Sequence, residues 1–457
     1  MEQTTVRDLV KASGGVLLAG NPDLPVRNVS IDSRVMKGED LFVPLIGARS
    51  DAHDFLAQAI ENGAAAVLSS RKIEPLPGAA WIQVEDTLKA LQNIGRDYRE
   101  RMGIPVVGVT GSVGKTTTRE MVAAALGAKY RVFKTSKNFN SDIGLPVTMT
   151  EISSLDEIAV LEMGMSDFGE MEVLSSMAKP SAAVMTNIGV AHIEQLHTQE
   201  NIFREKFKIT AGMERDGALV LNGDDGFLKK AGEGTGFRRI LYGFGEHCDF
   251  RGEDLEITGS GTEFTAVNGE KRVRVRLPVM GRHMAMNALA ALAVASLWDV
   301  SMEEAAGALE NFEGFRNRQQ IYPVRDYRVI DDTYNASPDS MKAALMVLAG
   351  MPTSGKKTAV LANMLELGEN SRAFHYDVGR FARQARPDVM ICIGDLAAEI
   401  GKGLMDGGET RTRVRCFETR EEALPFLKEE AQKGDLILFK GSNSMKLGEL
   451  IDALKRE

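Results

Sequence analysis

The chain has 457 residues, of which 44% are hydrophobic and 26% are charged, so it holds enough apolar material for about three packed domains. A net charge of −9 at pH 7 argues against general binding to nucleic acid or anionic lipid, because both favour a concentrated basic face. No apolar run approaches the roughly 18 residues of a membrane span, and residues 1–5 lack the basic start of a secretory signal. We therefore expect a cytoplasmic protein without a membrane span.

Residues 1–103 alternate short apolar strands with helices, for example a strand at 40–45 and a helix at 55–60, as in a small α/β domain. Two polar clusters, 30–34 and 47–53, lie next to strands. Each is equally well interpreted as a ligand contact or as a capped turn and solvated loop. The polar helical segment that ends before Gly103 marks the first predicted boundary.

The apolar run 104–109 leads into a glycine-interrupted loop and then into a helix-forming segment at 119–126. In such a loop backbone amides turn toward a polyphosphate, a lysine reaches the terminal phosphates and a threonine hydroxyl binds Mg²⁺. Val109 stands where the standard spacing has its first glycine, and the alternative is a flexible turn with a solvated lysine. We predict that this loop binds ATP. It consists of Thr110, Gly111, Ser112, Val113, Gly114, Lys115, Thr116 and Thr117.

Residues 104–313 continue with apolar runs at 158–161, 182–185 and 218–221, which are typical of parallel strands buried on both faces. Their alternation with helices predicts a doubly wound parallel sheet with ligands at the carboxyl ends of its strands. Glu162 and His192 follow two of these strands and should meet Lys115 at that edge.

Residues 314–457 repeat the pattern, with strands at 329–330, 358–361, 389–393 and 436–439, and predict a second, Rossmann-like α/β domain. The segment 331–338 is a loop by its Asn, Ser and Pro content, and a helix should start at 339–340. The three cysteines, Cys248, Cys392 and Cys416, are far apart and odd in number. They predict neither a disulfide framework nor a zinc site, and we expect buried or reduced thiols without a role.

Four motifs together resemble the Mur ligases, the ATP-dependent amide-bond-forming enzymes of peptidoglycan precursor synthesis. The motifs are the loop 110–117, Asn187-Ile188-Gly189 with His192, Gly281-x-His283 with Asn287, and the segment 331–338. Within the family, 331–341 and 363–369 are most similar to the members that add a dipeptide.

The resemblance implies three domains: 1–103 for the UDP-substrate, 104–313 for ATP and 314–457 as the ligase domain. It implies a monomer that joins D-alanyl-D-alanine to UDP-N-acetylmuramoyl-tripeptide through an acyl phosphate. A carboxylate is a poor electrophile, and phosphorylation gives it a good leaving group.

The same resemblance assigns metal ligands and implies two Mg²⁺ ions. Thr116 and Glu162 would hold one, and His192 and a carbamylated Lys206 the other, with Lys208 as the competitor for carbamylation. From the residues alone, His192 is more typical of a hydrogen-bonded structural group, and Lys206 of a solvated helix residue.

Further roles come from the resemblance alone. His283 and Asn287 would contact adenine, Arg318 the γ-phosphate and Asp332 the ribose, although Asn287 and Ser340 read equally well as helix-surface or capping residues. The residues expected to contact the other substrates are Ser33, Arg34, Asp51, Asn138, Asn140, Asn335 and Ser340.

Six positions depart from the family pattern. Four residues stand where glycines are usual: Ala52, Lys137, Asn317 and Ala362. Met284 replaces an asparagine, and Asn363 replaces an aspartate. None removes a group that handles phosphate or metal, so we expect activity with a shifted nucleotide affinity.

Three alternatives remain. A sister ligase that adds one amino acid, or folylpolyglutamate synthetase, shares the central domain, although the Asp-Asn-Pro-Arg signature of the diaminopimelate-adding enzyme is absent. A non-catalytic relative would bind the nucleotide without turnover. A small-molecule kinase would share only the phosphate loop and would form no amide.

Overall fold

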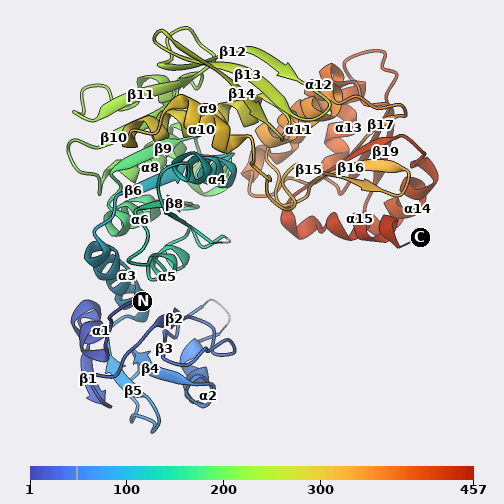
Figure 1. Cartoon of the computed structure of the whole chain (residues 1–457). Helices are drawn as coiled ribbons and strands as arrows, with labels where there is room; N and C mark the ends of the chain where they lie inside the picture. The colour runs from blue at the N-terminus through green and yellow to red at the C-terminus, as the bar shows by residue number, and fades with distance from the viewer. Residues whose placement is uncertain (48–49, 137, 457) are drawn as a thin grey trace.

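The computed structural model describes residues 1–47, 50–136 and 138–456. Ala48 and Arg49 of the second polar cluster and the departure at Lys137 lie outside the described residues. Figure 1 shows three α/β units: the N-terminal unit in blue below, the central unit above it and the C-terminal unit in orange and red to the right. Each contains one β-sheet.

The N-terminal sheet has the order β1-β5-β4-β3-β2, and only β1 is antiparallel to its neighbour. Helix α3 packs against α1 and also against α5 and α6 of the central unit, so it joins the two units. The helix ends at Gly103, whose left-handed backbone (φ 66°) suits glycine. The elements are α1 Val6–Ser13, β1 Val16–Ala19, β2 Asn28–Ser30, β3 Asp40–Phe42, α2 Leu56–Glu61, β4 Ala64–Ser69, β5 Ala80–Gln83 and α3 Thr87–Met102.

The central sheet has the order β14-β13-β12-β11-β10-β9-β6-β8-β7 and is parallel from β12 to β7. Its strands are β6 Val106–Thr110, β7 Val132–Lys134, β8 Ile158–Glu162, β9 Ala182–Met185, β10 Ala218–Asn222, β11 Arg238–Gly243, β12 Phe250–Ile257, β13 Thr262–Asn268 and β14 Lys271–Leu277. Its helices are α4 Lys115–Leu126, α5 Gly144–Met149, α6 Glu170–Ala178, α7 Ile193–Leu196, α8 Gln199–Phe207, α9 Arg282–Ala295 and α10 Met302–Leu309.

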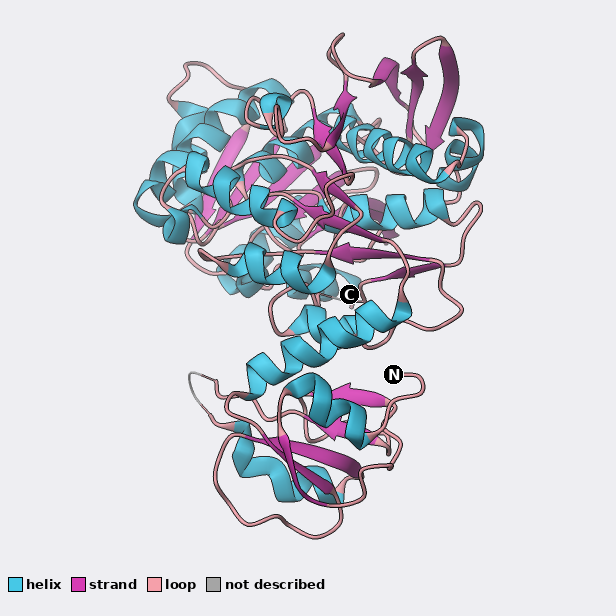
Figure 2. Cartoon of the chain, turned by 90° about the vertical axis from the view of Figure 1, so that its left-hand side faces the viewer, coloured by secondary structure: helices cyan, strands magenta, loops and turns pink. Residues whose placement is uncertain are grey.

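Alternate residues of β6 enter different cores, as a strand buried on both faces requires. Val107 and Val109 pack with α4, α9 and α10, whereas Val106 packs with α6 and α8 on the other face. Figure 2 shows this layering, with helices on both sides of the strands. The predicted parallel sheet is confirmed, but the antiparallel meander β12–β14 was not predicted, because its strands carry many charged residues and lack a long apolar run.

The C-terminal sheet has the order β15-β16-β20-β17-β18-β19, with only β15 antiparallel to its neighbour. Its elements are β15 Gln320–Val324, β16 Tyr327–Asp332, α11 Pro338–Gly350, β17 Lys357–Ala362, α12 Ser371–Ala385, β18 Val389–Ile393, α13 Ala397–Met405, β19 Arg413–Phe417, α14 Arg420–Glu430, β20 Leu436–Lys440 and α15 Gly448–Lys455. None of the helices in the described part of the chain combines the length and apolarity needed to cross a bilayer.

Candidate active site

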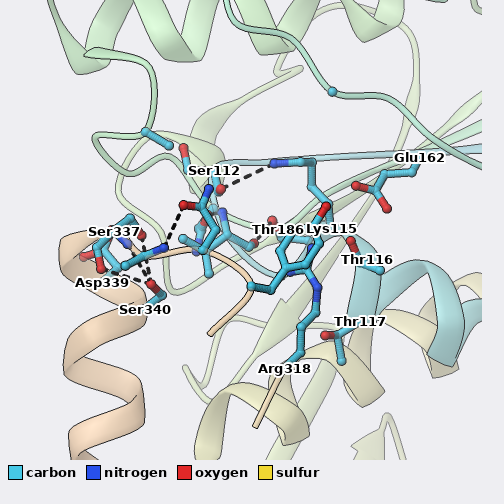
Figure 3. Close-up of a pocket in the computed structure, with 18 of the residues that line it drawn as sticks. Ser112, Lys115, Thr116, Thr117, Glu162, Thr186, Arg318, Ser337, Asp339 and Ser340 are labelled. Atoms are coloured by element: carbon cyan, nitrogen blue, oxygen red, sulfur yellow. Dashed lines mark hydrogen bonds between the residues drawn. The ribbon is translucent and has the colours of Figure 1, made fainter. Parts of the chain in front are cut away.

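A cavity of about 630 Å³ lies between the central and C-terminal units, at the carboxyl ends of the central strands (Figure 3). It brings together most of the predicted site residues. Those that line it are Ser112, Val113, Gly114, Lys115, Thr116, Thr117, Asn138, Asn140, Glu162, His192, His283, Asn287, Arg318, Asp332, Asn335 and Ser340. Six predicted residues are not among the lining residues: Thr110, Gly111, Lys206, Ser33, Arg34 and Asp51.

The glycine-interrupted loop connects β6 to α4, and the segment after β9 holds its shape. Ser112 N donates to Asn187 O (3.0 Å), and Val113 N donates to Asn187 Oδ1 (2.8 Å). A Cβ at Gly111 (φ 143°) would lie 1.9 Å from Thr186 Oγ1, so this close approach requires glycine. The loop is therefore a preformed strand-to-helix turn at a helix N-terminus, which favours anions.

Lys115 is the first residue of α4 and lies in the cavity wall rather than on an open loop. Its Nζ donates to Gly111 O at 2.9 Å, a bond within the loop itself. Desolvation lowers the pKa of Lys115, and Glu162 partly opposes this shift. A phosphate would add negative charge beside the Lys115 ammonium and favour its charged form.

Glu162 ends β8, and its side chain is 4% exposed. Arg119 Nη1 donates to its Oε2 (3.1 Å), and Asn140 Nδ2 donates to its Oε1 (2.8 Å). These bonds orient the carboxylate toward the cavity side where Thr116 lies (Figure 3). A carboxylate and a hydroxyl are hard oxygen donors of the kind that Mg²⁺ prefers. Asn140 thus contacts a candidate metal ligand, and its contact with substrate stays a prediction.

His192 connects the central unit to the C-terminal unit. Its Nδ1 lies 3.1 Å from Glu366 Oε2, and hydrogen bonding to His192 lowers the pKa of Glu366. Sequence reasoning did not select Glu366, although it lies in the 363–369 segment. Its approach to His192 depends on the packing of two domains, for which the sequence carries no local signal.

Lys206 and Lys208 differ sharply in their surroundings. Lys206 is fully buried, and its Nζ has no hydrogen-bond partner among the described residues. Desolvation and the charge of Lys115 hold the pKa of Lys206 well below its ordinary value. Lys208, in contrast, is partly exposed and pairs with Glu205 at 2.8 Å.

The residues predicted to contact adenine lie along the start of α9. His283 Nε2 is 2.9 Å from Gln319 Oε1, and burial lowers the pKa of His283. Asn287 is 8% exposed and accepts a hydrogen bond from Thr118 Oγ1 at 3.1 Å. The helix-surface interpretation of Asn287 is therefore wrong, because this residue is buried against α4.

Three family models match this chain: Mur ligase family, catalytic domain at 25–99; Mur ligase middle domain at 109–295; and Mur ligase, glutamate ligase domain at 317–443. The UDP-N-acetylmuramoyl-tripeptide–D-alanyl-D-alanine ligase of Bacillus subtilis is 40% identical over 99% of each chain. The chain belongs to the Mur ligase family.

Solved structures agree with this family. The MurF structure from Acinetobacter baumannii has a TM-score of 0.91 at 30% identity and covers 99% of both chains. The MurF ligase from Thermotoga maritima in complex with ADP has a TM-score of 0.85 at 29% identity, over 95% of this chain and 98% of that one. The α/β fold in three domains is thus the Mur ligase fold.

In this Mur ligase the C-terminal wall of the cavity contains a buried lysine that sequence reasoning missed. Lys440 Nζ donates to Asp332 Oδ2 at 2.6 Å and to Asn335 O at 3.0 Å. The Arg318 guanidinium lies 4.0 Å from the centre of the Tyr334 ring. Lys440 ends β20, and a strand-terminal lysine is too common for its position alone to signal a site.

Ser340 acts as a capping residue at the start of α11. Its Oγ accepts from Ser337 N at 2.9 Å and donates to Ser337 O at 3.0 Å, while it also lines the cavity. The capping interpretation is thus supported, and the cavity position leaves room for a substrate contact. Asp339 lies beside it, and a Cβ at Gly189 would be 2.5 Å from its Oδ2.

The three residues predicted to face UDP all have partners within the N-terminal unit. Ser33 Oγ donates to Gln58 Oε1 (2.8 Å), and Arg34 pairs with Asp32. Desolvation would raise the pKa of Asp51, but hydrogen bonds from His53 and then Arg71 lower it to about 2. None of the three is among the residues that line the cavity, and the N-terminal unit to which they belong lies below the central unit in Figure 1.

Two of the departures from the family pattern have a local explanation. Asn317 has φ 59°, a left-handed conformation that asparagine tolerates better than most residues do, which explains how it can replace glycine. Asn363 donates to Asp395 Oδ1 (2.9 Å) and accepts from Ala397 N (2.8 Å), so it locks the turn after β18. Met284 is buried in the core and also lines the cavity.

Proposed function

We propose that this protein is an ATP-dependent ligase that joins D-alanyl-D-alanine to UDP-N-acetylmuramoyl-tripeptide. The observation that carries the proposal is one cavity that holds both the phosphate loop and the C-terminal segment with Asn335 and Ser340. A relative that is 40% identical over 99% of both chains is named for this activity. A sister ligase, a non-catalytic relative and a kinase fit that combination less well.

The reaction needs an activated carboxylate, because a carboxylate is a poor electrophile. Transfer of the γ-phosphoryl group of ATP gives an acyl phosphate, and the dipeptide amine then attacks its carbonyl carbon and releases phosphate. Lys115 and Arg318 bring two cationic groups to one cavity, where they would neutralise charge on the phosphates. His283 and Asn287 would contact adenine, and Asp332, held by Lys440, would contact ribose.

Two Mg²⁺ sites belong to this proposal. Thr116 with Glu162 would hold one ion, and His192 with a carbamylated Lys206 would hold the other. Bound Mg²⁺ would neutralise phosphate charge during transfer. The fit at the first site rests on the Glu162 carboxylate, which Arg119 and Asn140 orient and shield from bulk water.

The fit at the second site rests on the unpartnered Lys206 Nζ. A buried ammonium without a partner is costly, and a lowered pKa favours the neutral amine. A neutral amine adds to carbon dioxide: an N–C bond forms, a proton leaves the nitrogen, and a carbamate anion results. That anion would suit a metal, whereas Lys208 is already neutralised by Glu205.

The domains divide the work in this proposal. Residues 1–103 would bind the UDP end through Ser33, Arg34 and Asp51, residues 104–313 would bind ATP, and residues 314–457 would admit the dipeptide. Asn138 lines the cavity and would contact the acceptor. The protein would act as a cytoplasmic monomer.

The test is phosphate release from ATP and Mg²⁺ with UDP-N-acetylmuramoyl-tripeptide, with and without D-alanyl-D-alanine. We expect release that needs both acceptors and a pentapeptide product by mass. Release with a single amino acid in place of the dipeptide would indicate a sister ligase. A phosphorylated product without an amide would indicate a kinase, and ATP binding without release a non-catalytic relative.

The variant Lys115→Ala should abolish this turnover, by a factor of about 10³ or more, while the protein stays folded. Lys115 lines the cavity and contributes no apolar packing to the domain core. Lys72→Ala, which changes an exposed lysine of the N-terminal unit, is the matched control and should keep full activity. Unchanged ATP turnover in Lys115→Ala would refute the role of the loop.

A further inference from the structure

Two of the three cysteines lie side by side at the edge of the C-terminal sheet, and neither is among the residues that line the cavity. Cys392 on β18 is the direct register partner of Cys416 on the parallel strand β19. Neighbouring strands are about 4.8 Å apart, within the Cα separation that a disulfide spans. Side chains of register partners point to the same face of the sheet, so the two thiols lie side by side on that face.

Helix α13, which packs on this face of the sheet, approaches both sulfur atoms at the same residue. A Cβ at Gly401 of α13 would lie 3.2 Å from Cys416 Sγ and 3.7 Å from Cys392 Sγ. The glycine leaves the room that the two sulfur atoms share. Cys416 is exposed, so a reagent from solvent reaches the Cys416 thiol first. Cys392 is buried and lies next to Cys416 on the neighbouring strand.

The environment distinguishes the two thiols chemically. Interaction between the two thiols is the main cause that lowers the pKa of Cys416 to about 7, and the same interaction, together with burial, raises the pKa of Cys392. The Lys402 ammonium adds to the lowering at Cys416. Since the thiolate is the reactive form, the exposed Cys416 is the nucleophile and Cys392 is the resolving thiol.

We propose that Cys392 and Cys416 form an oxidation site that takes a hydroperoxide and closes to a disulfide across β18 and β19. The Cys416 thiol first gives its proton to solvent, and the thiolate attacks the terminal peroxide oxygen. The O–O bond breaks, a sulfenic acid forms, and the released alkoxide or hydroxide takes up one proton from solvent and leaves as an alcohol or water. The Cys392 thiol then attacks the Cys416 sulfur, the S–S bond forms, and the hydroxyl leaves with the thiol proton as water. Two thiols lose two electrons, and the peroxide gains them.

The sheet topology permits this closure. Strand β19 lies at the end of the strand order and, among the described residues, pairs with β18 alone, so it can shift toward its neighbour without breaking a second ladder. The bond would form one residue before Ile393 and the turn that Asn363 locks through Asp395. The proposal is independent of the ligase activity and concerns a different surface of the C-terminal domain.

The experiment treats the reduced full-length protein with hydrogen peroxide, alkylates the remaining thiols and maps peptides by mass without reductant. We expect one linked peptide pair containing Cys392 and Cys416, a loss of two of the three thiols per chain, an alkylated Cys248, and full reversal by dithiothreitol. Intermolecular linkage through Cys416, or oxidation of all three thiols at the same rate, would overturn the proposal.

Three variants separate the roles of the thiols. In Cys416→Ser, an exposed and conservative change, Cys392 should stay reduced under the same treatment, and its oxidation at the wild-type rate would contradict the proposed order. In Cys392→Ser, Cys416 should stop at a sulfenic acid that dimedone traps, and absence of the adduct counts against Cys416 as the nucleophile. Cys248→Ser is the matched control and should form the Cys392–Cys416 link as the wild type does.

Discussion

At the scale of single residues, Lys206 is the most unusual group in the molecule. It is a fully buried lysine whose Nζ has no partner among the described residues. A buried unpaired charge is costly, so a protein retains such a lysine in neutral or modified form. Its position in the sequence shows none of this, because it lies in a polar helical segment with a second lysine two residues away.

We predict that Lys206→Ala loses activity by about two to three orders of magnitude, as removal of a transition-state charge contact does. Short carboxylic acids should restore part of the activity by occupying the place of the carbamate. Phosphate release at a series of formate and acetate concentrations measures this rescue. Lys208→Ala is the matched control, and full activity of Lys206→Ala with loss in Lys208→Ala would assign the role to Lys208.

Asp51 supports an acid-sensitivity prediction for the N-terminal domain. Hydrogen bonds from His53 and Arg71 bring its pKa from 3.8 to about 2 in the folded state, although desolvation opposes them. A carboxyl with a depressed folded-state pKa contributes stability above its unfolded pKa, and this contribution is lost as the pH falls from about 4 toward 2. We therefore expect a loss of stability in that window.

Fluorescence of Trp81, which is buried in the N-terminal domain, should report this acid transition in a Trp298→Phe background, where Trp81 is the remaining tryptophan. In Asp51→Asn the pH dependence between about 4 and 2 should flatten, while the stability at pH 7 falls. Asp23→Asn, which changes an exposed aspartate of the same domain, should keep the wild-type curve. A full acid transition in Asp51→Asn would assign the effect to another carboxyl.

At the scale of secondary-structure elements, the turn from β6 to α4 is held by close packing against the segment after β9. Gly111 has φ 143°, and a Cβ there would clash with Thr186 Oγ1. Gly169, at the start of α6, also has a positive φ (84°), but a Cβ there meets no atom within 4 Å. A substitution at Gly169 would therefore test backbone strain alone, whereas one at Gly111 would test strain and a steric clash together.

We predict that Gly169→Ala costs about 1–2 kcal/mol from backbone strain alone. Gly111→Ala should cost about 1–3 kcal/mol more, because Thr186 must move, and it should also weaken nucleotide binding. Urea unfolding midpoints and a titration with ADP measure the two effects. Equal destabilisation by both changes would mean that the loop and Thr186 can separate freely.

Most elements could be predicted from hydrophobic patterns. The runs at 182–185 and 389–393 match β9 and β18, because strands buried on both faces are continuously apolar. The meander β12–β14 could not be predicted in this way, since β14 carries alternating arginines such as Arg272 and Arg274. Cross-strand ion pairs, including Arg272 with Glu253, stabilise this exposed sheet, and such pairs depend on register.

At the scale of the whole molecule, the N-terminal domain stands apart from the cavity, while the C-terminal domain already contacts the central one through Glu366 and His192 (Figure 1). In the proposed reaction, a substrate with its UDP end on the first domain and its carboxylate beside the phosphates of ATP would bring these parts together. Glycines with positive φ lie near both predicted domain boundaries, Gly103 (φ 66°) and Gly314 (φ 76°). Such residues absorb changes in chain direction readily.

We predict that UDP-N-acetylmuramoyl-tripeptide with a non-hydrolysable ATP analogue reduces the radius of gyration in small-angle X-ray scattering. Domain closure around a ligand is the physical reason. D-Alanyl-D-alanine alone is the control and should leave the profile unchanged. An unchanged profile with both nucleotides present would mean that the domains bind their ligands without moving.

The sequence by itself determined the three α/β units, the phosphate loop with Lys115, and the position of Glu162 and His192 after strands of the central sheet; their role as metal ligands was implied by the family resemblance alone. These features depend on local patterns: apolar periodicity, glycine spacing and the polar residues that follow strands. Only the tertiary structure decided that Lys206 rather than Lys208 is buried, that Lys440 holds Asp332, and that Cys392 meets Cys416. Burial and pairing between distant segments arise from sheet order and domain packing, which no local pattern encodes.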